Sequence, residues 1–326
     1  MAPDALQQRV EALRRRRAAP RVVVVGDAML DRYHHQAAPD RRPMPAPGDA
    51  TENLPGGAAN VAANAAALGG RATLVAAVGS DAAGAQLAAA LAAAGVTARL
   101  LEVADHPTTT KTRRVVAGRV GARHDRERRL PPAAAGELRR HHADALLDAD
   151  IVILSDYAKG ALADVAGWIA LCRAAGTPVL VDSKNLAADC RGADLATPNL
   201  DEACALLGRR VAAPALADHA SALLARLGSR AVLVTLGADG MLLLRPRRPP
   251  LRLPALGRGV DPTGAGDTVV AAVAVALASG AGLADAVLFA AHAAATVVAR
   301  TGTAVAPIDE VACALATDLR TPAWGS

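Results

Sequence analysis

The sequence predicts an α/β fold in which a doubly wound, mostly parallel sheet is sandwiched by helices. Short β-branched runs recur, and each precedes a longer Ala- and Leu-rich stretch: Val22 to Val25, Thr73 to Val78, Ile151 to Leu154, Val179 to Val181, and Val232 to Val234. The runs are apolar without alternation, which is typical of strands buried on both faces. Hydrophobic residues make up 52% of the 326-residue chain, enough to fill a sizeable core.

One large domain is expected over residues 21–320, after a helical extension at 1–20 and before a tail at 321–326. Arg14 to Arg17 lie on the short predicted helix and are interpreted as a solvated face. Residues 98–128 break the alternation, with three consecutive threonines and alternating Val and Arg, and predict antiparallel strands of a small β lid. The Pro-rich part of residues 36–54, Pro39 to Pro47, either belongs to this lid or forms a disordered loop.

Composition narrows the class of partner. A formal net charge of +5 suits a protein that handles anions, but the 2% aromatic content leaves few rings on which bases could stack, so no nucleic-acid partner is expected. The Ala-rich segments are interrupted before they reach membrane-spanning length, and no signal peptide is evident, so we expect no membrane and a cytoplasmic protein. The four cysteines and the paired histidines lack metal-ligand spacing.

Polar residues follow the predicted strands at the edge where open parallel sheets bind ligands. They are Asp27 and Asp31, Asp156, Asp182 and Lys184, Asn199 and Glu202, and Thr235 and Gly237. If the strands are parallel, these side chains converge on one crevice.

The sharpest motif is the segment from Asp261 to Thr268, which opens a long apolar helical stretch running to about Ser279. Small residues at Gly264, Ala265 and Gly266 leave amides uncovered at a helix N-terminus, which favours a phosphate group. Asp267 in the first turn is placed to accept a proton from an attacking hydroxyl. An ordinary capped helix, with Asp267 complementing the dipole, is the alternative.

A second glycine pair, Gly56 and Gly57, leads into another helix, where Asn60 is available to bind a sugar hydroxyl. A flexible helix start is the plain alternative. The chain lacks the G-x-x-x-x-G-K-[ST] loop and a G-x-G-x-x-G turn after a strand, so a nucleotide site has to be built differently.

The stretch from Gly56 to Asn60 and the segment from Asp261 to Thr268, in this order along the chain, resemble the two signatures of the ribokinase-like (PfkB) carbohydrate kinases. Between them, Asn199 to Glu202 is similar to the family's N-x-x-E element, and Thr235 to Gly240 to its nucleotide-binding turn. The stretch Phe289 to Ala295, with His292, resembles the helix beside the adenine. The resemblance runs from about Arg21 to about Ile308 and implies ATP as phosphoryl donor.

Within the family, the strongest resemblance is to the D-glycero-D-manno-heptose 7-phosphate 1-kinases, on the stretches Gly26 to Tyr33, Pro55 to Val61, His106 to Arg113 and Ser155 to Gly160. It implies phosphorylation of the anomeric hydroxyl of a heptose 7-phosphate. One departure concerns Asp40 to Pro47, where those kinases usually show an Ile-Ser-Pro-Glu-Ala-Pro-like stretch. This departure puts the lid geometry, the dimer contacts and the exact sugar in question.

The resemblance also implies roles for individual residues. Asp31 would bind sugar hydroxyls, unless it caps a loop. Lys111 and Arg113 would hold the sugar's phosphate, unless they are solvated strand charges. Lys184 would contact a phosphate or the sugar, or else pair with Asp182. Glu202 would act on Mg²⁺ through water, unless it is an ordinary helix-surface glutamate. Asp261 and Thr263 resemble a monovalent-cation (K⁺) site, and the lid would form a homodimer contact.

Three other functions are weighed against this one. Another kinase of the same fold would act on a different sugar or on a nucleoside. A non-catalytic sensor of sugar phosphate or nucleotide would keep the fold, but the presence of Asp267 argues against it. An NAD-dependent dehydrogenase is disfavoured because the glycine fingerprint after Val25 is missing.

Overall fold

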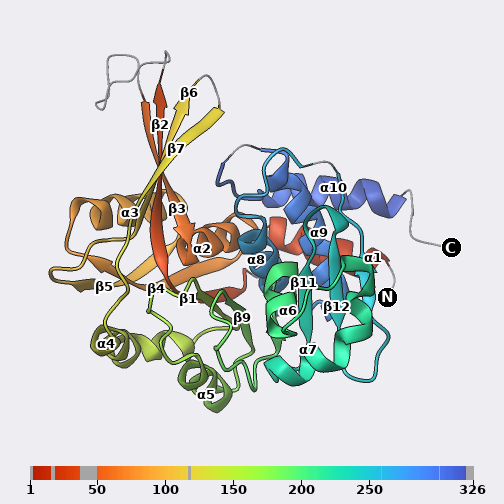
Figure 1. The fold of residues 1–326 in the computed structure, drawn as a ribbon. Coiled ribbons are helices and arrows are strands. Elements are labelled where there is room, and N and C mark those ends of the chain that lie inside the picture. The colour runs from red at the N-terminus through yellow and green to blue at the C-terminus, as the bar shows by residue number, and fades with distance from the viewer. Residues whose placement is uncertain are drawn as a thin grey trace.

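The computed structural model describes residues 3–15, 19–36, 50–116, 119–257, 259–300 and 302–320. The strands of its larger sheet are β1 (Arg21–Gly26), β4 (Arg71–Gly79), β5 (Thr97–Val103), β8 (Ile151–Asp156), β9 (Val179–Ser183), β10 (Leu195–Ala196), β11 (Val232–Thr235), β12 (Met241–Leu244) and β13 (Leu251–Leu253). Their order is β13-β12-β11-β10-β9-β8-β1-β4-β5 (Figure 1).

The larger sheet is mostly parallel, as predicted. Every neighbouring pair from β5 across to β11 is parallel, and only β12 and β13 are antiparallel at one edge. The five apolar runs of the sequence lie in β1, β4, β8, β9 and β11. The carboxyl ends of the parallel strands therefore open on one common edge.

Helices cover both faces of this sheet. One face is covered by α1 (Pro3–Arg14), α2 (Ala58–Ala67), α3 (Ala82–Ala93), α8 (Ala265–Ala278), α9 (Leu283–Val298) and α10 (Ile308–Arg320). The other is covered by α4 (Pro132–His142), α5 (Val165–Ala175), α6 (Leu200–Leu206) and α7 (Ala220–Leu227). In β1, Val22 and Val24 belong to the first core, and Val23 and Val25 to the second. Two buried faces explain why the strand sequences do not alternate.

The smaller sheet, called the lid sheet below, is made of β2 (Ala28–Gln36), β3 (Ala50–Gly57), β6 (Thr110–Val116) and β7 (Arg119–Arg126), and it stands off one end of the molecule (Figure 1). Its outer pairs are antiparallel, but β2 and β6 are parallel. The prediction of a purely antiparallel lid is therefore wrong. Since β2 and β6 follow β1 and β5, two parallel strands, both enter the lid sheet from the same edge and run the same way.

The predicted lid segment 98–128 is also wrong in its first part, because β5 pairs with β4 in the larger sheet. As an edge strand with several exposed positions, β5 carries polar residues that imitate a half-buried antiparallel strand. Of the segment 36–54, residue 36 ends β2, residues 50–54 belong to β3, and Pro39 to Pro47 lie outside the described residues.

The N-terminal helix is part of the core. Leu6, Val10 and Leu13 of α1 are buried in the first core, while Arg14 and Arg15 face solvent and pair with carboxylates, as predicted for a solvated face. Of the predicted arginine run, Arg16 and Arg17 lie outside the described residues. None of the helices described in the structure is both long and apolar enough to span a bilayer.

Candidate active site

A cavity of about 1030 Å³ lies at the carboxyl edge of the larger sheet. Residues that follow β9, β10 and β11 line one side, and the turn before α8 together with α9 lines the other. The predicted site residues on its wall are Lys184, Asn199, Thr235, Gly237, Gly240, Gly264, Ala265, Gly266 and Asp267. The structure thus brings the residues at the strand ends together with the glycine-rich turn. The wall formed by the residues after β9, β10 and β11 is called the nucleotide side below, after its predicted ligand.

The turn that begins α8 is shaped to receive an anion. Gly264 has a φ of 79°, a left-handed conformation that favours glycine. A methyl group at Gly266 would meet nothing within 4 Å, so this position faces open space. The amide of Ala265 donates to the carbonyl of Pro262, whereas the described residues supply no acceptor for the amides of Gly266 and Asp267. These two amides remain available to an anion at the helix N-terminus.

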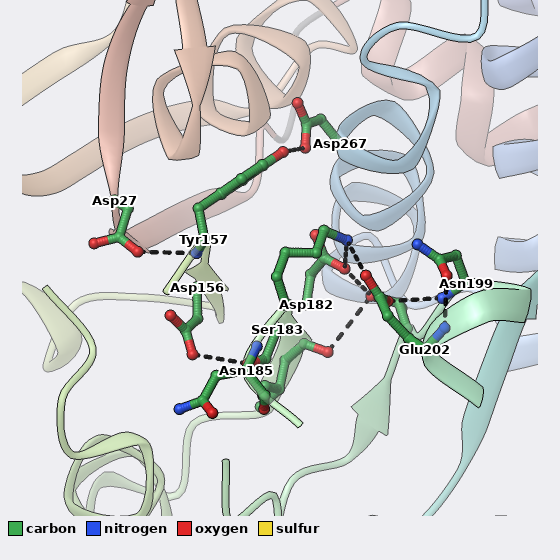
Figure 2. Close-up of polar contacts among 12 residues, drawn as sticks. Asp27, Asp156, Tyr157, Asp182, Ser183, Asn185, Asn199, Glu202 and Asp267 are labelled. Atoms are coloured by element: carbon green, nitrogen blue, oxygen red, sulfur yellow. Dashed lines mark hydrogen bonds and ion pairs between the residues drawn. The ribbon is translucent and has the colours of Figure 1, made fainter. Parts of the chain in front are cut away.

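Asp267 is buried at the floor of the cavity. Asn60 Nδ2 donates to its Oδ2 at 2.8 Å. The Tyr157 hydroxyl donates to its Oδ1 at 2.5 Å (Figure 2). Burial raises the pKa of Asp267 to about 6, although both hydrogen bonds favour the ionised form. At neutral pH the carboxylate is ionised and is basic enough to take a proton from a hydroxyl.

Tyr157 is a contact of Asp267 that the sequence interpretation missed. It directly follows the end of β8, one residue beyond Asp156, and its ring lines the cavity. Its position after a buried strand was the available signal, but a Tyr there is equally compatible with a packing role.

Lys184 lies between two carboxylates on the nucleotide side. Its Nζ is 3.3 Å from Asp182 Oδ1 and 3.2 Å from Glu202 Oε1. Glu202 and Asn199 form a reciprocal capping box at the start of α6, which fixes the glutamate. The predicted ion pair of Lys184 with Asp182 is present, and it extends to Glu202.

The sugar-side candidates lie on the lid sheet. Asp31 of β2 accepts from Arg113 of β6 at 2.9 Å and from the Thr303 hydroxyl at 3.0 Å. Lys111 of β6 lies 5.6 Å from the centre of the Tyr157 ring, and burial lowers the pKa of its ammonium. Lys184 Nζ lies 5.9 Å from the centre of the same ring, and the hydroxyl of Tyr157 contacts Asp267.

Two other predicted substrate ligands serve the framework. Asp27 accepts from the backbone amides of Tyr157, Lys159 and Ala161, each at 2.9 Å, and so ties down the loop after β8. Asp156 accepts from the amide of Ala158 and from the Ser183 hydroxyl. These carboxylates hold the site in shape, and neither has a described contact with the cavity wall residues of α8.

The glycine pair before α2 is required by packing. A methyl group at Gly56 would lie 2.7 Å from Asp31 Oδ2, and one at Gly57 would lie 2.6 Å from the carbonyl of Asp27. Packing therefore requires glycine at these two positions, and their contact with a ligand stays a prediction. Asn60, which was expected to bind a sugar hydroxyl, donates to Asp267, and its contact with the sugar also stays a prediction.

Asp261 fixes the loop before α8. Its carboxylate accepts from the amides of Thr263 and Gly302, which joins this loop to the segment before α10. Among the described residues no cluster of three or more His, Cys, Asp or Glu side chains has the geometry to hold a metal ion. His292 does not line the cavity, and its Nε2 lies 3.4 Å from Asp318 Oδ2 of α10; its contact with a nucleotide stays a prediction.

Comparisons with known proteins agree with this geometry. A bifunctional protein HldE from Halorhodospira halophila is 46% identical over 303 residues, covering 90% of this chain and 63% of that protein. The ribokinase of Arabidopsis thaliana, solved with ribose and ATP, is 25% identical with a TM-score of 0.73, covering 91% of this chain and 99% of that one. Phosphofructokinase-2 of Escherichia coli, solved with potassium, shares the fold at 24% identity and a TM-score of 0.75, covering 93% and 99%.

The chain thus spans less than two thirds of the HldE protein that it matches. The family model described as "pfkB family carbohydrate kinase" matches residues 19–310, which include the lid sheet, the cavity and the α8 turn. The chain belongs to the pfkB family of carbohydrate kinases.

Proposed function

We propose that the chain transfers the γ-phosphoryl group of ATP to the anomeric hydroxyl of a heptose 7-phosphate, D-glycero-D-manno-heptose 7-phosphate or a close stereoisomer, to give the 1,7-bisphosphate. Family membership supports a carbohydrate kinase, and the similarity to HldE proteins, together with the sequence stretches shared with heptose kinases, supports this sugar.

The observation that carries the proposal is the position of Asp267. Its carboxylate is buried at the point where the free amides of α8 open into the cavity, and Lys111 of the lid sheet lies just beyond Tyr157. A triphosphate in the cavity would place its end at the amides of Gly266 and Asp267, and a sugar phosphate would enter from the lid side. The sugar oxygen would attack in line while Asp267 takes its proton.

The residues of the nucleotide side fit a hydrated magnesium ion bound to ATP. Asp182 lines the cavity, and Lys184 Nζ pairs both with Asp182 and with Glu202. Mg²⁺ keeps several waters and needs few protein oxygens, so contact through water fits one or two such carboxylates. Mg²⁺ would neutralise charge on the phosphates. We further propose a potassium site near Asp261, a homodimer contact through the lid sheet and a cytoplasmic location.

A coupled ADP-release assay across sugars and sugar phosphates tests this function. The panel contains heptose 7-phosphates of different stereochemistry, fructose 6-phosphate, fructose 1-phosphate, ribose and adenosine, and ³¹P NMR assigns the phosphorylated position. We expect the highest kcat/KM for a heptose 7-phosphate, with a new phosphate at the anomeric carbon. Preference for another acceptor would assign a different sugar kinase, and binding of ATP and sugar phosphate without turnover of any acceptor would indicate a sensor.

A further inference from the structure

Tyr157 occupies the boundary between the two halves of the candidate site. Its backbone amide donates to Asp27 and its hydroxyl donates to Asp267 (Figure 2). The centre of its ring lies 5.6 Å from Lys111 Nζ and 5.9 Å from Lys184 Nζ. Tyr157 therefore contacts Asp267 and lies beside a cation of the lid sheet and a cation of the nucleotide side.

The hydrogen bonds to Asp267 leave its carboxylate little freedom. Tyr157, at the end of β8, holds Oδ1, and Asn60, on α2, holds Oδ2. Asn60 is itself buried and accepts from Asn64 Nδ2, so the second donor is fixed from behind. Because two donors from different elements engage the two oxygens, the plane of the carboxylate is set before any ligand arrives.

We propose that Tyr157 is a positioning residue of the phosphoryl transfer: its hydroxyl orients the Asp267 carboxylate toward the acceptor and stabilises the ionised form that accepts the proton. This inference rests on the proposed function for its catalytic consequence, but the hydrogen bond itself can be tested without substrate.

The charged and polar groups around Asp267 predict the direction of the effect. Burial is the largest influence on its pKa and raises it; the hydrogen bonds from Tyr157 and Asn60 and the charge of Lys184 lower it, and the charge of Asp182 raises it. Burial and the neighbouring carboxylates raise the pKa of Tyr157 well above its usual value, so its hydroxyl stays protonated and remains a donor. Loss of that hydroxyl leaves burial less opposed, and the pKa of Asp267 then moves further upward.

The variant Tyr157→Phe isolates this hydroxyl, because the ring beside Lys111 and Lys184 is retained. We expect the acid limb of the kcat/KM profile against pH to move up by about one unit, because the ionised form of Asp267 loses a hydrogen bond to its charge. The loss relative to wild type from this shift is then about fivefold at pH 6, approaches about tenfold at lower pH and is small at pH 8.5. Tyr157→Leu removes the ring as well, and is expected to add a rise in the KM for the sugar phosphate.

A substrate-independent readout separates this inference from the proposed function. In ¹³C-labelled protein, the Asp267 carboxyl resonance is assigned by its absence in Asp267→Asn and titrated in wild type and Tyr157→Phe. A higher midpoint in Tyr157→Phe supports the inference even if no heptose phosphate is turned over. An unchanged midpoint in a folded variant, or a loss of kcat/KM that is equal at every pH, overturns it.

Discussion

Asp267 combines a folding cost with a proposed catalytic role. The carboxylate is 6% exposed, and burial raises its pKa from the ordinary 3.8 to about 6. A base that is poised close to neutral pH takes up a proton more readily than a solvated aspartate, while it is still ionised at pH 7. The hydrogen bonds from Asn60 and Tyr157 offset part of the cost of burying the charge.

Asp267→Asn is therefore expected to stabilise the fold at neutral pH. The cost of ionising Asp267 is absent below pH 3.8, grows as the pH rises toward about 6, and is complete above it. One pKa unit corresponds to about 1.4 kcal/mol, so the gain is on the order of 2 kcal/mol at pH 8. Urea unfolding at pH 8 and pH 4.5 measures it. A gain that is as large at pH 4.5 as at pH 8 would contradict this assignment of the pKa.

The sequence predicts some residues of the candidate site better than others. Asp267 and Gly266 are predictable because the small residues before a long apolar helix constrain the backbone directly. The contacts of Asp27 and Tyr157 are not predictable from the sequence, because both depend on how the loop after β8 folds back over the end of β1. A strand-end carboxylate looks the same in sequence whether it faces a ligand or a neighbouring loop.

At the level of elements, the first turn of α8 determines the anion site. Helix α8 is buried along almost its whole length, so the sheet and α9 hold its N-terminus in place. The two free amides there belong to a rigid element, which is the arrangement that stabilises charge without reorganisation.

Gly266→Ala tests this turn. No atom lies within 4 Å of the added methyl group, and alanine favours a helix over glycine by up to about 1 kcal/mol, so thermal stability is expected to stay equal or rise. The methyl group would stand where a phosphate approaches the amides, so the KM for ATP is expected to rise tenfold or more. Gly26→Ala is the contrasting variant, because its methyl would lie 2.0 Å from the carbonyl of Ser155 and would destabilise the fold. An unchanged KM for ATP in Gly266→Ala would contradict the proposed anion site.

Strand β6 of the lid sheet supplies the proposed grip on the sugar's phosphate. Replacing Lys111 by Met removes a half-buried cation, and the KM for the sugar phosphate is expected to rise about tenfold to a hundredfold with the KM for ATP nearly unchanged. Arg140→Met on α4 removes the same charge from an exposed position and is the matched control. Equal effects of the two substitutions would mean that only net charge matters, contrary to the proposed role.

The elements differ in how well their sequences specify them. The central strands were predictable because two buried faces demand continuous apolar residues. Edge strand β5 and the parallel pairing of β2 with β6 were not, because half-buried strands look alike in sequence whatever sheet and direction they adopt.

At the scale of the whole molecule, the candidate site joins segments that are far apart in the chain. Asn60 on α2, Tyr157 after β8 and Asp267 on α8 meet through hydrogen bonds that span more than 100 residues of sequence each. The larger sheet supplies the proposed nucleotide side and the lid sheet the proposed sugar side, with Asp267 between them. The central claim is that phosphoryl transfer takes place at this junction with Asp267 as the base.

The turnover of Asp267→Asn, measured with the best acceptor from the sugar panel, tests this claim most directly. The account predicts that kcat falls by about a hundredfold to ten-thousandfold, with the dissociation constant for ATP nearly unchanged, because the amides of α8 remain in place. Near-normal turnover by the folded variant would contradict it.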